Sequence, residues 1–167
     1  FAPAMNTNMY THAATQENIR ILRERGALFV GPASGRLACG SEGPGRMAEI
    51  SDILDAALIA ASQQKDYAGK RVLINSGPNH EPIDPMRYLG NCSSGKMGRA
   101  LALEALRRGA EVCVVTGPAA VSPPHGAQVI SVQTAEEMYE SVMLRMDSYD
   151  IIIGAAAVAD YTPETVT

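Results

Sequence analysis

The chain has 167 residues and a formal net charge of −4; 46% of its residues are apolar, 19% are charged, and Trp is absent. These values exclude a disordered chain, a collagen-like repeat and a disulfide miniprotein, and the length suffices for a buried core. The acidic balance, with no basic face, argues against a nucleic-acid partner, and no apolar run approaches the ~18 residues that span a bilayer.

The first residues of the chain and its cysteines indicate which cellular compartment to expect. No charged segment followed by an apolar stretch opens the chain, so we expect no secretory signal. Cys39, Cys92 and Cys113 are scattered, which fits neither a disulfide framework nor a zinc site. We therefore expect a cytoplasmic α/β protein that does not enter a membrane.

The first 30 residues predict one helix and one strand. Thr15 is the expected N-cap of a helix that carries Ile19 and Leu22 inward and ends at Gly26. The apolar residues 27–30 predict a short strand, which leads into a glycine-rich loop.

That loop covers residues 31–45, and a second helix follows it. Apolar residues recur at helical spacing from Ile50 to Ala61, which predicts an amphipathic helix. Residues 62–69 are polar and aperiodic, so a domain boundary is expected there. We predict one domain over residues 1–64, a linker over 65–69 and a second domain over 70–167.

The second domain alternates strands with helices. Strands are predicted over residues 70–75, 111–115, 129–132 and 150–154, the last one fully buried. One helix is predicted over 93–108, with Met97, Leu101 and Ala105 in one row. A capping box of Thr134 and Glu137 predicts a further helix, with Met138, Val142 and Met146 on one face.

This alternation predicts a doubly wound parallel sheet covered on both faces. Ligands of such sheets bind beyond the carboxyl ends of the strands. The loops at residues 76–94 and 155–162 are therefore the expected place for chemistry.

A candidate phosphate loop lies in the first of these segments. Residues 90–97 read GNCSSGKM, which fits G-x-x-x-x-G-K but has Met where a P-loop needs a magnesium-binding hydroxyl. Ser93, Ser94 and Gly95 are expected at a helix N-terminus, where free N–H groups attract anions, and Lys96 adds a cation. Phosphate binding and an ordinary Ser-capped helix stay open as alternatives.

Longer motifs resemble a known enzyme pair. SGPNHEPIDPMR at residues 76–87, NCSSGKMG at 91–98 and AAAVADY at 155–161 resemble the phosphopantothenate–cysteine ligase domain. PAMNTNMY at 3–10, GRLACGSE at 35–42 and GRM at 45–47 resemble the phosphopantothenoylcysteine decarboxylase flavoproteins. The order is that of the fused bifunctional coenzyme A biosynthesis protein, a multifunctional enzyme.

The resemblance implies a fold for each part. The first part would be the C-terminal part of a flavodoxin-like decarboxylase domain, and the second a Rossmann-like doubly wound ligase domain. The family's flavin-binding strands, its catalytic His and its Lys-rich nucleotide segment have no counterpart in this sequence, which therefore resembles an internal portion spanning the junction. Tyr10 replaces the usual Trp, and Pro78-Asn79 replaces Gly-Thr in the ligase loop.

For the decarboxylase half, the resemblance implies FMN as cofactor and 4′-phosphopantothenoylcysteine as substrate. The flavin oxidises the substrate thiol, carbon dioxide leaves, and the enethiol is reduced. Asn6 would hold the substrate carboxylate, and Cys39 would donate the proton. From the residues alone, a turn-capping Asn and an inert Cys are the alternatives.

For the ligase half, the resemblance implies that CTP with Mg²⁺ activates 4′-phosphopantothenate as an acyl-cytidylate, which the cysteine amine attacks. Asn91 would be catalytic at the acyl phosphate region. The expected nucleotide-binding residues are Ser93, Ser94, Gly95, Lys96, Ala156, Ala157 and Asp160. Asp160 would lie near the base and ribose or bind the metal, and the family implies a homo-oligomer.

Other interpretations stay open. A non-catalytic nucleotide-binding module and a flavodoxin-like electron carrier share the expected fold. Asp84 and Arg87 could form an ion pair that fixes the long loop. His12, His80 and His125 have no neighbours that suggest metal ligation.

Overall fold

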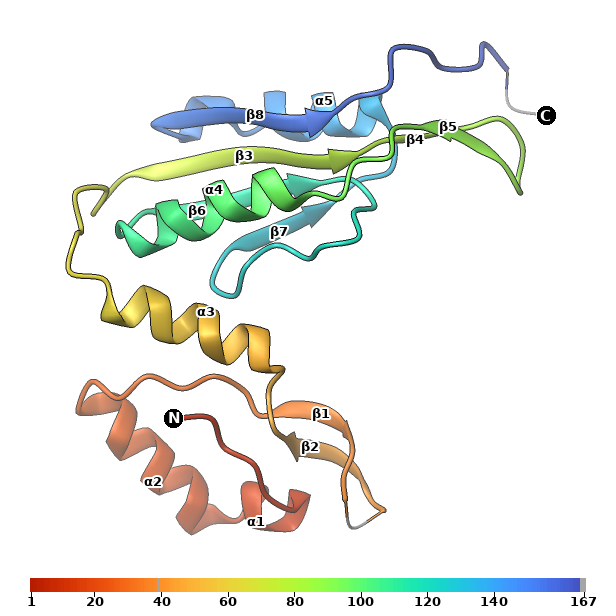
Figure 1. The fold of residues 1–167 in the computed structure, drawn as a ribbon. Helices are drawn as coiled ribbons and strands as arrows, with labels where there is room; N and C mark the ends of the chain where they lie inside the picture. The colour runs from red at the N-terminus through yellow and green to blue at the C-terminus, as the bar shows by residue number, and fades with distance from the viewer. Residues whose placement is uncertain (39, 166–167) are drawn as a thin grey trace. The chain divides into compact units, whose positions relative to one another are not determined.

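The computed structural model describes residues 1–38 and 40–165 (Figure 1). The chain divides into two compact units, Phe1–Ala57 and Leu58–Thr167. Each unit is described by itself. No helix of the described residues is long and apolar enough to cross a membrane.

Unit 1 begins with two short helices. α1 (Thr7–Thr11) is capped by Asn6, and α2 (Ala13–Glu24) is capped by His12, whose Nδ1 accepts from the amide of Ala14 at 3.2 Å. The predicted N-cap at Thr15 is therefore wrong. The helix begins earlier, at Ala13, and the side chain of His12 accepts the hydrogen bond that an N-cap residue provides. The end of the helix agrees with prediction, since Gly26 follows it at φ +87°.

The predicted strand at residues 27–30 is absent, and the predicted loop contains a hairpin instead. β1 (Ala33–Arg36) pairs antiparallel with β2 (Glu42–Arg46). Gly43 and Gly45 lie in β2 at φ +154° and +136°. A side chain at Gly45 would collide with the carbonyl of Met5, and the amide of Met5 donates to the Gly45 carbonyl at 2.9 Å. The glycines thus let the N-terminal segment lie against the hairpin.

The helix predicted over residues 50–61 is confirmed as α3 (Ile50–Ala61). The polar segment after it is ordered against α4 (Lys96–Arg107) in unit 2. Lys65 Nζ donates to the carbonyls of Ile59 at 2.9 Å and Arg107 at 3.0 Å. Asp66 pairs with Arg108, which also lies 3.7 Å above the ring of Tyr67.

Unit 2 contains the predicted parallel sheet, in the order β7-β6-β3-β8. The strands are β3 (Arg71–Pro78), β6 (Glu111–Thr116), β7 (Gln128–Ser131) and β8 (Ile151–Ala157). β3 pairs with both β6 and β8, so that Val72 lies opposite Val112 and Ile151. β4 (His80–Pro82) and β5 (Tyr88–Gly90) form an antiparallel hairpin within the predicted long loop.

Helices cover both faces of the sheet (Figure 1). α4 packs its buried Ala102, Ala105 and Leu106 against one face, which includes Val72 and Ile74. On the other face, α5 (Ala135–Met143) buries Met138 against a cluster of Leu73, Cys113 and Val115. A short 3-10 helix (Met146–Ser148) then leads toward β8.

Three predictions for unit 2 are wrong, namely the start of α4, the burial of Met97 and the full burial of β8, and the capping box is confirmed at Thr134. α4 begins at Lys96 rather than residue 93, and Met97 is 67% exposed because the helix turns its Gly98–Ala102 row to the sheet. β8 alternates half-buried and exposed residues, since it lies at the edge of the described sheet. In the capping box, Thr134 accepts from Glu137, but the Glu137 carboxylate accepts from Gln133.

The first turn of α4 approaches β3 closely at Gly98. A methyl group added there would overlap the side chain of Ser76. Ala favours a helix over Gly by about 1 kcal/mol, but overlap in a packed interior costs about 1–3 kcal/mol. We therefore expect Gly98→Ala to lower the urea midpoint of unfolding.

The control is Gly154→Ala, where the nearest contact of an added methyl is Asn75 Oδ1 at 3.8 Å. This variant should keep its urea midpoint or raise it slightly. A raised midpoint for Gly98→Ala would show that α4 does not lie this close to β3.

Candidate functional site

The carboxyl edge of the unit 2 sheet is packed closely through glycines. Gly77 follows Ser76 at φ +76°, and Gly117 follows β6 so near β3 that a side chain would collide with the carbonyl of Pro78. Gly95 lies at φ +78° with Ala119 2.7 Å from the position of an added methyl. The turns after β3 and β6 and the start of α4 therefore form one compact edge.

The candidate anion loop lies at this edge. Gly95 is the N-cap of α4 and makes no side-chain cap hydrogen bond, so the first amides of the helix are not capped by a side chain. Ser93 and Ser94 are half-buried, Lys96 is exposed, and the Ser94 carbonyl accepts from the amide of Val121 at 3.1 Å. Uncapped amides, two hydroxyls and a cation are groups that bind phosphate.

Asn91 connects this loop to the end of β8. Its Nδ2 donates to the carbonyls of Ala157 at 3.2 Å and Val158 at 3.0 Å. An amide nitrogen has two hydrogens, so these contacts leave Oδ1 as the group that Asn91 offers a ligand. In this arrangement Asn91 presents an acceptor, and donation to an acyl phosphate would require it to release a carbonyl.

Asn75 holds the same segment from β3. Its Oδ1 accepts from the amides of Ala155 at 2.8 Å and Ala156 at 3.2 Å. Sequence reasoning missed Asn75, although a polar residue near the end of an apolar strand at the carboxyl edge was an available signal.

Asp160 lines a cavity of about 310 Å³. Glu81, Thr134 and Glu136 also line it, whereas the residues of the anion loop do not. Glu81 is 4% exposed and accepts from the amide of Ala135, the first residue of α5, at 2.8 Å. The structure thus places Asp160 beside a buried carboxylate that the sequence did not single out, on a different part of the edge from the anion loop.

A second cavity, of about 480 Å³, opens at the ends of β6 and β7. Its polar lining comes from Thr116, Ser122, Ser131 and Gln133, and no charged side chain lines it. None of the predicted site residues contributes to this cavity.

In unit 1, Asn6 lines a cavity of about 390 Å³. The hairpin supplies Arg36, Leu37, Ala38 and Arg46 to the same cavity. Arg46 is paired with Glu49, whereas Arg36 is exposed and has no ion pair among the described residues. Cys39 lies outside the described residues, but Ala38 before it lines the cavity with Asn6.

The two roles suggested for Asn6 are compatible with its geometry. Its Oδ1 accepts from the amide of Asn8 at 2.8 Å, which is the capping interaction of α1. The amide group of Asn6 also carries N–H donors, and such donors are chemically suited to a carboxylate.

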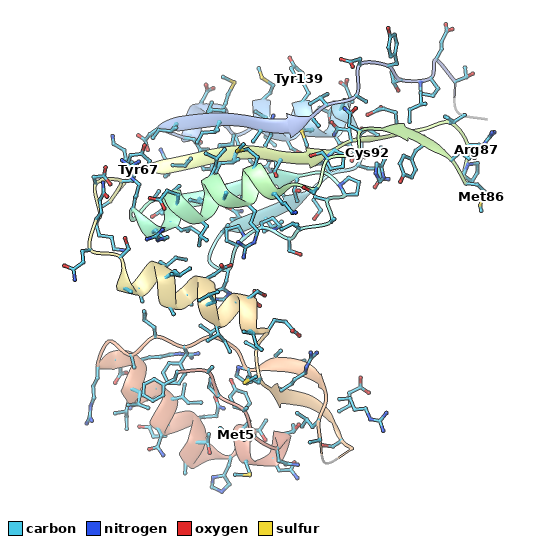
Figure 2. All side chains as sticks on the ribbon, in the orientation of Figure 1. Met5, Tyr67, Met86, Arg87, Cys92 and Tyr139 are labelled. Atoms are coloured by element: carbon cyan, nitrogen blue, oxygen red, sulfur yellow. The ribbon has the colours of Figure 1, made fainter. Side chains whose placement is uncertain are left out.

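Asp84 and Arg87 form the ion pair that was considered from the sequence. Arg87 Nε donates to Asp84 Oδ2 at 2.7 Å, and Asp84 Oδ1 accepts from the amides of Met86 and Arg87 at 2.8 Å each. Figure 2 shows Met86 and Arg87 at the tip of the β4–β5 hairpin. The guanidinium of Arg87 and the Met86 amide lower the pKa of the Asp84 carboxyl. The pair fixes the turn of the β4–β5 hairpin, where His80 also stacks on Tyr88.

Within residues 1–38 and 40–165, no group of three or more potential metal ligands gathers. Cys92 is exposed and Cys113 is buried, and both are free.

A parallel sheet with helices on both faces and a polar carboxyl edge defines unit 2 as a doubly wound α/β domain. Residues 67–167 match the family described as "DNA/pantothenate metabolism flavoprotein C-terminal domain", and residues 1–61 match the family described as "Flavoprotein". The chain belongs to the DNA/pantothenate metabolism flavoprotein family.

Individual relatives agree with this. The chain is 50% identical over 165 residues to the coenzyme A biosynthesis bifunctional protein CoaBC of Vibrio parahaemolyticus. It covers 41% of that relative, so it spans about two fifths of the length of the curated proteins it matches.

Solved structures agree as well. The crystal structure of a C-terminal domain of CoaBC matches with 46% identity and a TM-score of 0.59, covering 62% of this chain and 53% of that one. The DNA/pantothenate metabolism flavoprotein from Streptococcus pneumoniae matches with 31% identity and a TM-score of 0.54, covering 56% of this chain and 42% of that one.

The Asp84 turn gives a pH dependence. Because the folded pKa of Asp84 is lowered, the carboxylate contacts are complete above the usual Asp pKa of ~3.9 and are lost as pH falls through the lower folded value. We expect the NMR amide shifts of Met86 and Arg87 to titrate with a midpoint below 3.9, the usual value quoted above.

Arg87→Gln should move this midpoint up toward the usual value, and Asp84→Asn should abolish the titration of both amides. An unshifted midpoint in the unsubstituted protein would mean that the carboxylate does not hold the turn.

Proposed function

We propose that unit 2 is the amino-terminal part of a CTP-dependent phosphopantothenate–cysteine ligase and acts in coenzyme A biosynthesis. The observation that carries the proposal is the junction at Asn91, which hydrogen-bonds to the 157–158 carbonyls just before an uncapped helix N-terminus. A nucleoside triphosphate needs one surface for its phosphates and an adjoining surface for its nucleoside. The N-terminus of α4 and the segment at residues 157–158 are the two surfaces that Asn91 joins. The names of the CoaBC relatives support this reaction.

Each predicted residue has a proposed role. Ser93, Ser94 and Gly95 bind the triphosphate through hydroxyls and helix amides, and Lys96 adds a point charge. The backbone of Ala156 and Ala157 borders the nucleoside, with Asp160 near the ribose, the base or Mg²⁺. Mg²⁺ would offset triphosphate charge, with Asp160 as its candidate protein ligand.

Asn91 is proposed to act on the reacting groups through Oδ1, the atom that its backbone contacts leave available. An acceptor suits the N–H of the attacking cysteine amine better than it suits a phosphate, which has no donor. The carboxylate of 4′-phosphopantothenate attacks the α-phosphorus of CTP and pyrophosphate leaves, which gives the acyl-cytidylate. The cysteine amine then attacks the acyl carbon, loses a proton and displaces CMP to form the amide.

We further propose that residues 1–64, which include unit 1, are the carboxyl-terminal part of an FMN-dependent phosphopantothenoylcysteine decarboxylase, and that residues 65–69 link them to the ligase part. The match of residues 1–61 to the Flavoprotein family supports FMN as the cofactor. The described residues of unit 1 fit a substrate carboxylate, through Asn6, but they gather no cradle for a flavin phosphate.

In this half, Asn6 holds the substrate carboxylate by donation from Nδ2, and Cys39 follows the cavity-lining Ala38 in the sequence. A thiol with a pKa near 8.5 is mostly protonated at neutral pH, so Cys39 is the proposed proton donor. A neutral amide at Asn6 suits a carboxylate that must lose its charge, because a cation would stabilise the reactant.

The ligase proposal predicts different failures for Lys96 and Asn91. Lys96→Ala removes a charge-assisted contact, which typically costs about 1.5–3 kcal/mol, so CTP affinity should fall roughly 10- to 150-fold. Asn91→Ala also loses the hydrogen bonds to the Ala157 and Val158 carbonyls, so CTP affinity should fall roughly 10-fold, and single turnover should slow beyond that, since the loss of Oδ1 falls on the transition state. Calorimetric CTP binding and single-turnover rates measure the two effects.

Thermal melting provides the control for Asn91. A variant with unchanged turnover and a lowered melting temperature would show that Asn91 only holds the backbone. Absence of CTP binding by the unsubstituted protein would overturn the ligase proposal, leaving other nucleotides to be tested.

The decarboxylase proposal predicts that Asn6→Asp and Asn6→Ala differ. Asp caps a helix as well as Asn does, so Asn6→Asp should keep the melting temperature while its charge repels the substrate carboxylate. We expect at least about a 10-fold loss in substrate-dependent CO₂ release with FMN supplied. Asn6→Ala should lose both stability and activity, and normal activity in Asn6→Asp would leave Asn6 as a cap only.

A further inference from the structure

Two asparagine side chains form hydrogen bonds with backbone groups of four successive residues at the end of β8. We propose that Asn75 is a positioning residue of the nucleotide site, which fixes the segment that borders the nucleoside without contacting the ligand itself. The proposal rests on the proposed nucleotide site of unit 2.

The contacts of Asn75 lie within the sheet. Asn75 is half-buried on β3, with Gly154 of β8 opposite it in the register. Its Oδ1 accepts from two successive amides, Ala155 at 2.8 Å and Ala156 at 3.2 Å. Successive strand amides point in opposite directions, so a neighbouring strand cannot accept from both. The single Oδ1 atom of Asn75 therefore accepts from two amides that one neighbouring strand could not both pair with.

Asn91 fixes the following two residues by the opposite chemistry. Its Nδ2 donates to the carbonyls of Ala157 and Val158, immediately after the amides that Asn75 accepts. Four successive residues are thus held by side chains as β8 ends and the chain turns toward Asp160. The first pair depends on Asn75 and the second pair on Asn91.

Asn75 and Asn91 belong to different elements of the fold. Asn91 belongs to the loop that continues into Ser93 and Lys96, whereas Asn75 belongs to β3 and makes no side-chain hydrogen bond to that loop within the described part of the chain. Ala155 and Ala156 also pair with Ser76 and Gly77 of β3, so loss of Asn75 removes only their side-chain acceptor and loosens this segment, and it leaves the helix N-terminus of α4 intact. A preordered binding segment gives higher affinity because less ordering accompanies binding.

Because Asn75 and the anion loop belong to different elements, loss of Asn75 should affect two ligands differently. Inorganic tripolyphosphate can occupy the anion loop alone, whereas CTP also needs the segment after Ala155. Asn75→Ala should weaken CTP binding roughly 10-fold, the effect of two lost backbone hydrogen bonds, and leave tripolyphosphate binding within about 2-fold. Lys96→Ala should weaken both ligands.

The experiment is calorimetry with CTP and with tripolyphosphate, each with Mg²⁺, on the protein and its variants. Asn75→Asp keeps an acceptor oxygen in place and should restore CTP affinity to within about 3-fold. Gln128→Ala, an exposed amide at the start of β7, is the matched control and should change neither affinity. Asn75→Gln, whose oxygen is displaced by one methylene, should weaken CTP selectively and serves if Asn75→Ala does not fold.

The outcomes are distinct. Selective loss of CTP affinity, with rescue by Asn75→Asp, supports the positioning role. Equal effects on both ligands, or no effect on either, overturn it, since a purely structural loss would lower the melting temperature without separating the ligands. If the unsubstituted protein binds tripolyphosphate but not CTP, or neither ligand, the proposed nucleotide function itself fails.

Discussion

Backbone hydrogen bonding at the carboxyl edge of the β7-β6-β3-β8 sheet is the constraint on which the candidate ligase site depends. Strands end there, and each exposed peptide group must find a partner in protein, water or ligand. In this structure Asn75 and Asn91 supply partners for four residues of the departing β8, whereas the start of α4 has no side-chain cap. The backbone groups at the end of β8 therefore have side-chain partners, whereas the first amides of α4 have no side-chain cap and are suited to an anion.

Close packing keeps these two sides together. Gly98 brings α4 against Ser76, Gly117 brings the β6 turn against Pro78, and Gly95 lies beside Ala119. Each glycine removes a side chain where two backbones meet, so the loops cannot separate without opening the interior. The same principle applies in unit 1, where Gly45 lets Met5 lie on the hairpin beside Asn6. Both candidate sites are therefore built on backbone approaches that larger residues would prevent.

The polar groups of the two units differ in kind. In unit 1, Asn6 and the guanidinium of Arg36 line one cavity, which suits an anionic ligand. In unit 2, the cavity of Asp160 contains the buried carboxylate of Glu81 and shares no lining residue with the anion loop. Asp160 is consequently better suited to hydroxyl or amino groups of a ligand than to its phosphates.

The sequence by itself determined the parallel α/β architecture, α3, the strands around Val72 and Val114, and the motifs that identify the family. Periodicity and glycine spacing are local properties, so they are readable without a structure. It did not predict the β1–β2 hairpin, because glycine-rich strands look like loops, nor the half-exposed β8, because the burial of a strand depends on its neighbours. The roles of Asn75, Glu81 and Arg36 were decided only by the tertiary structure. Their partners lie far along the chain, and only folding brings Oδ1 of Asn75 to amides 80 and 81 residues away.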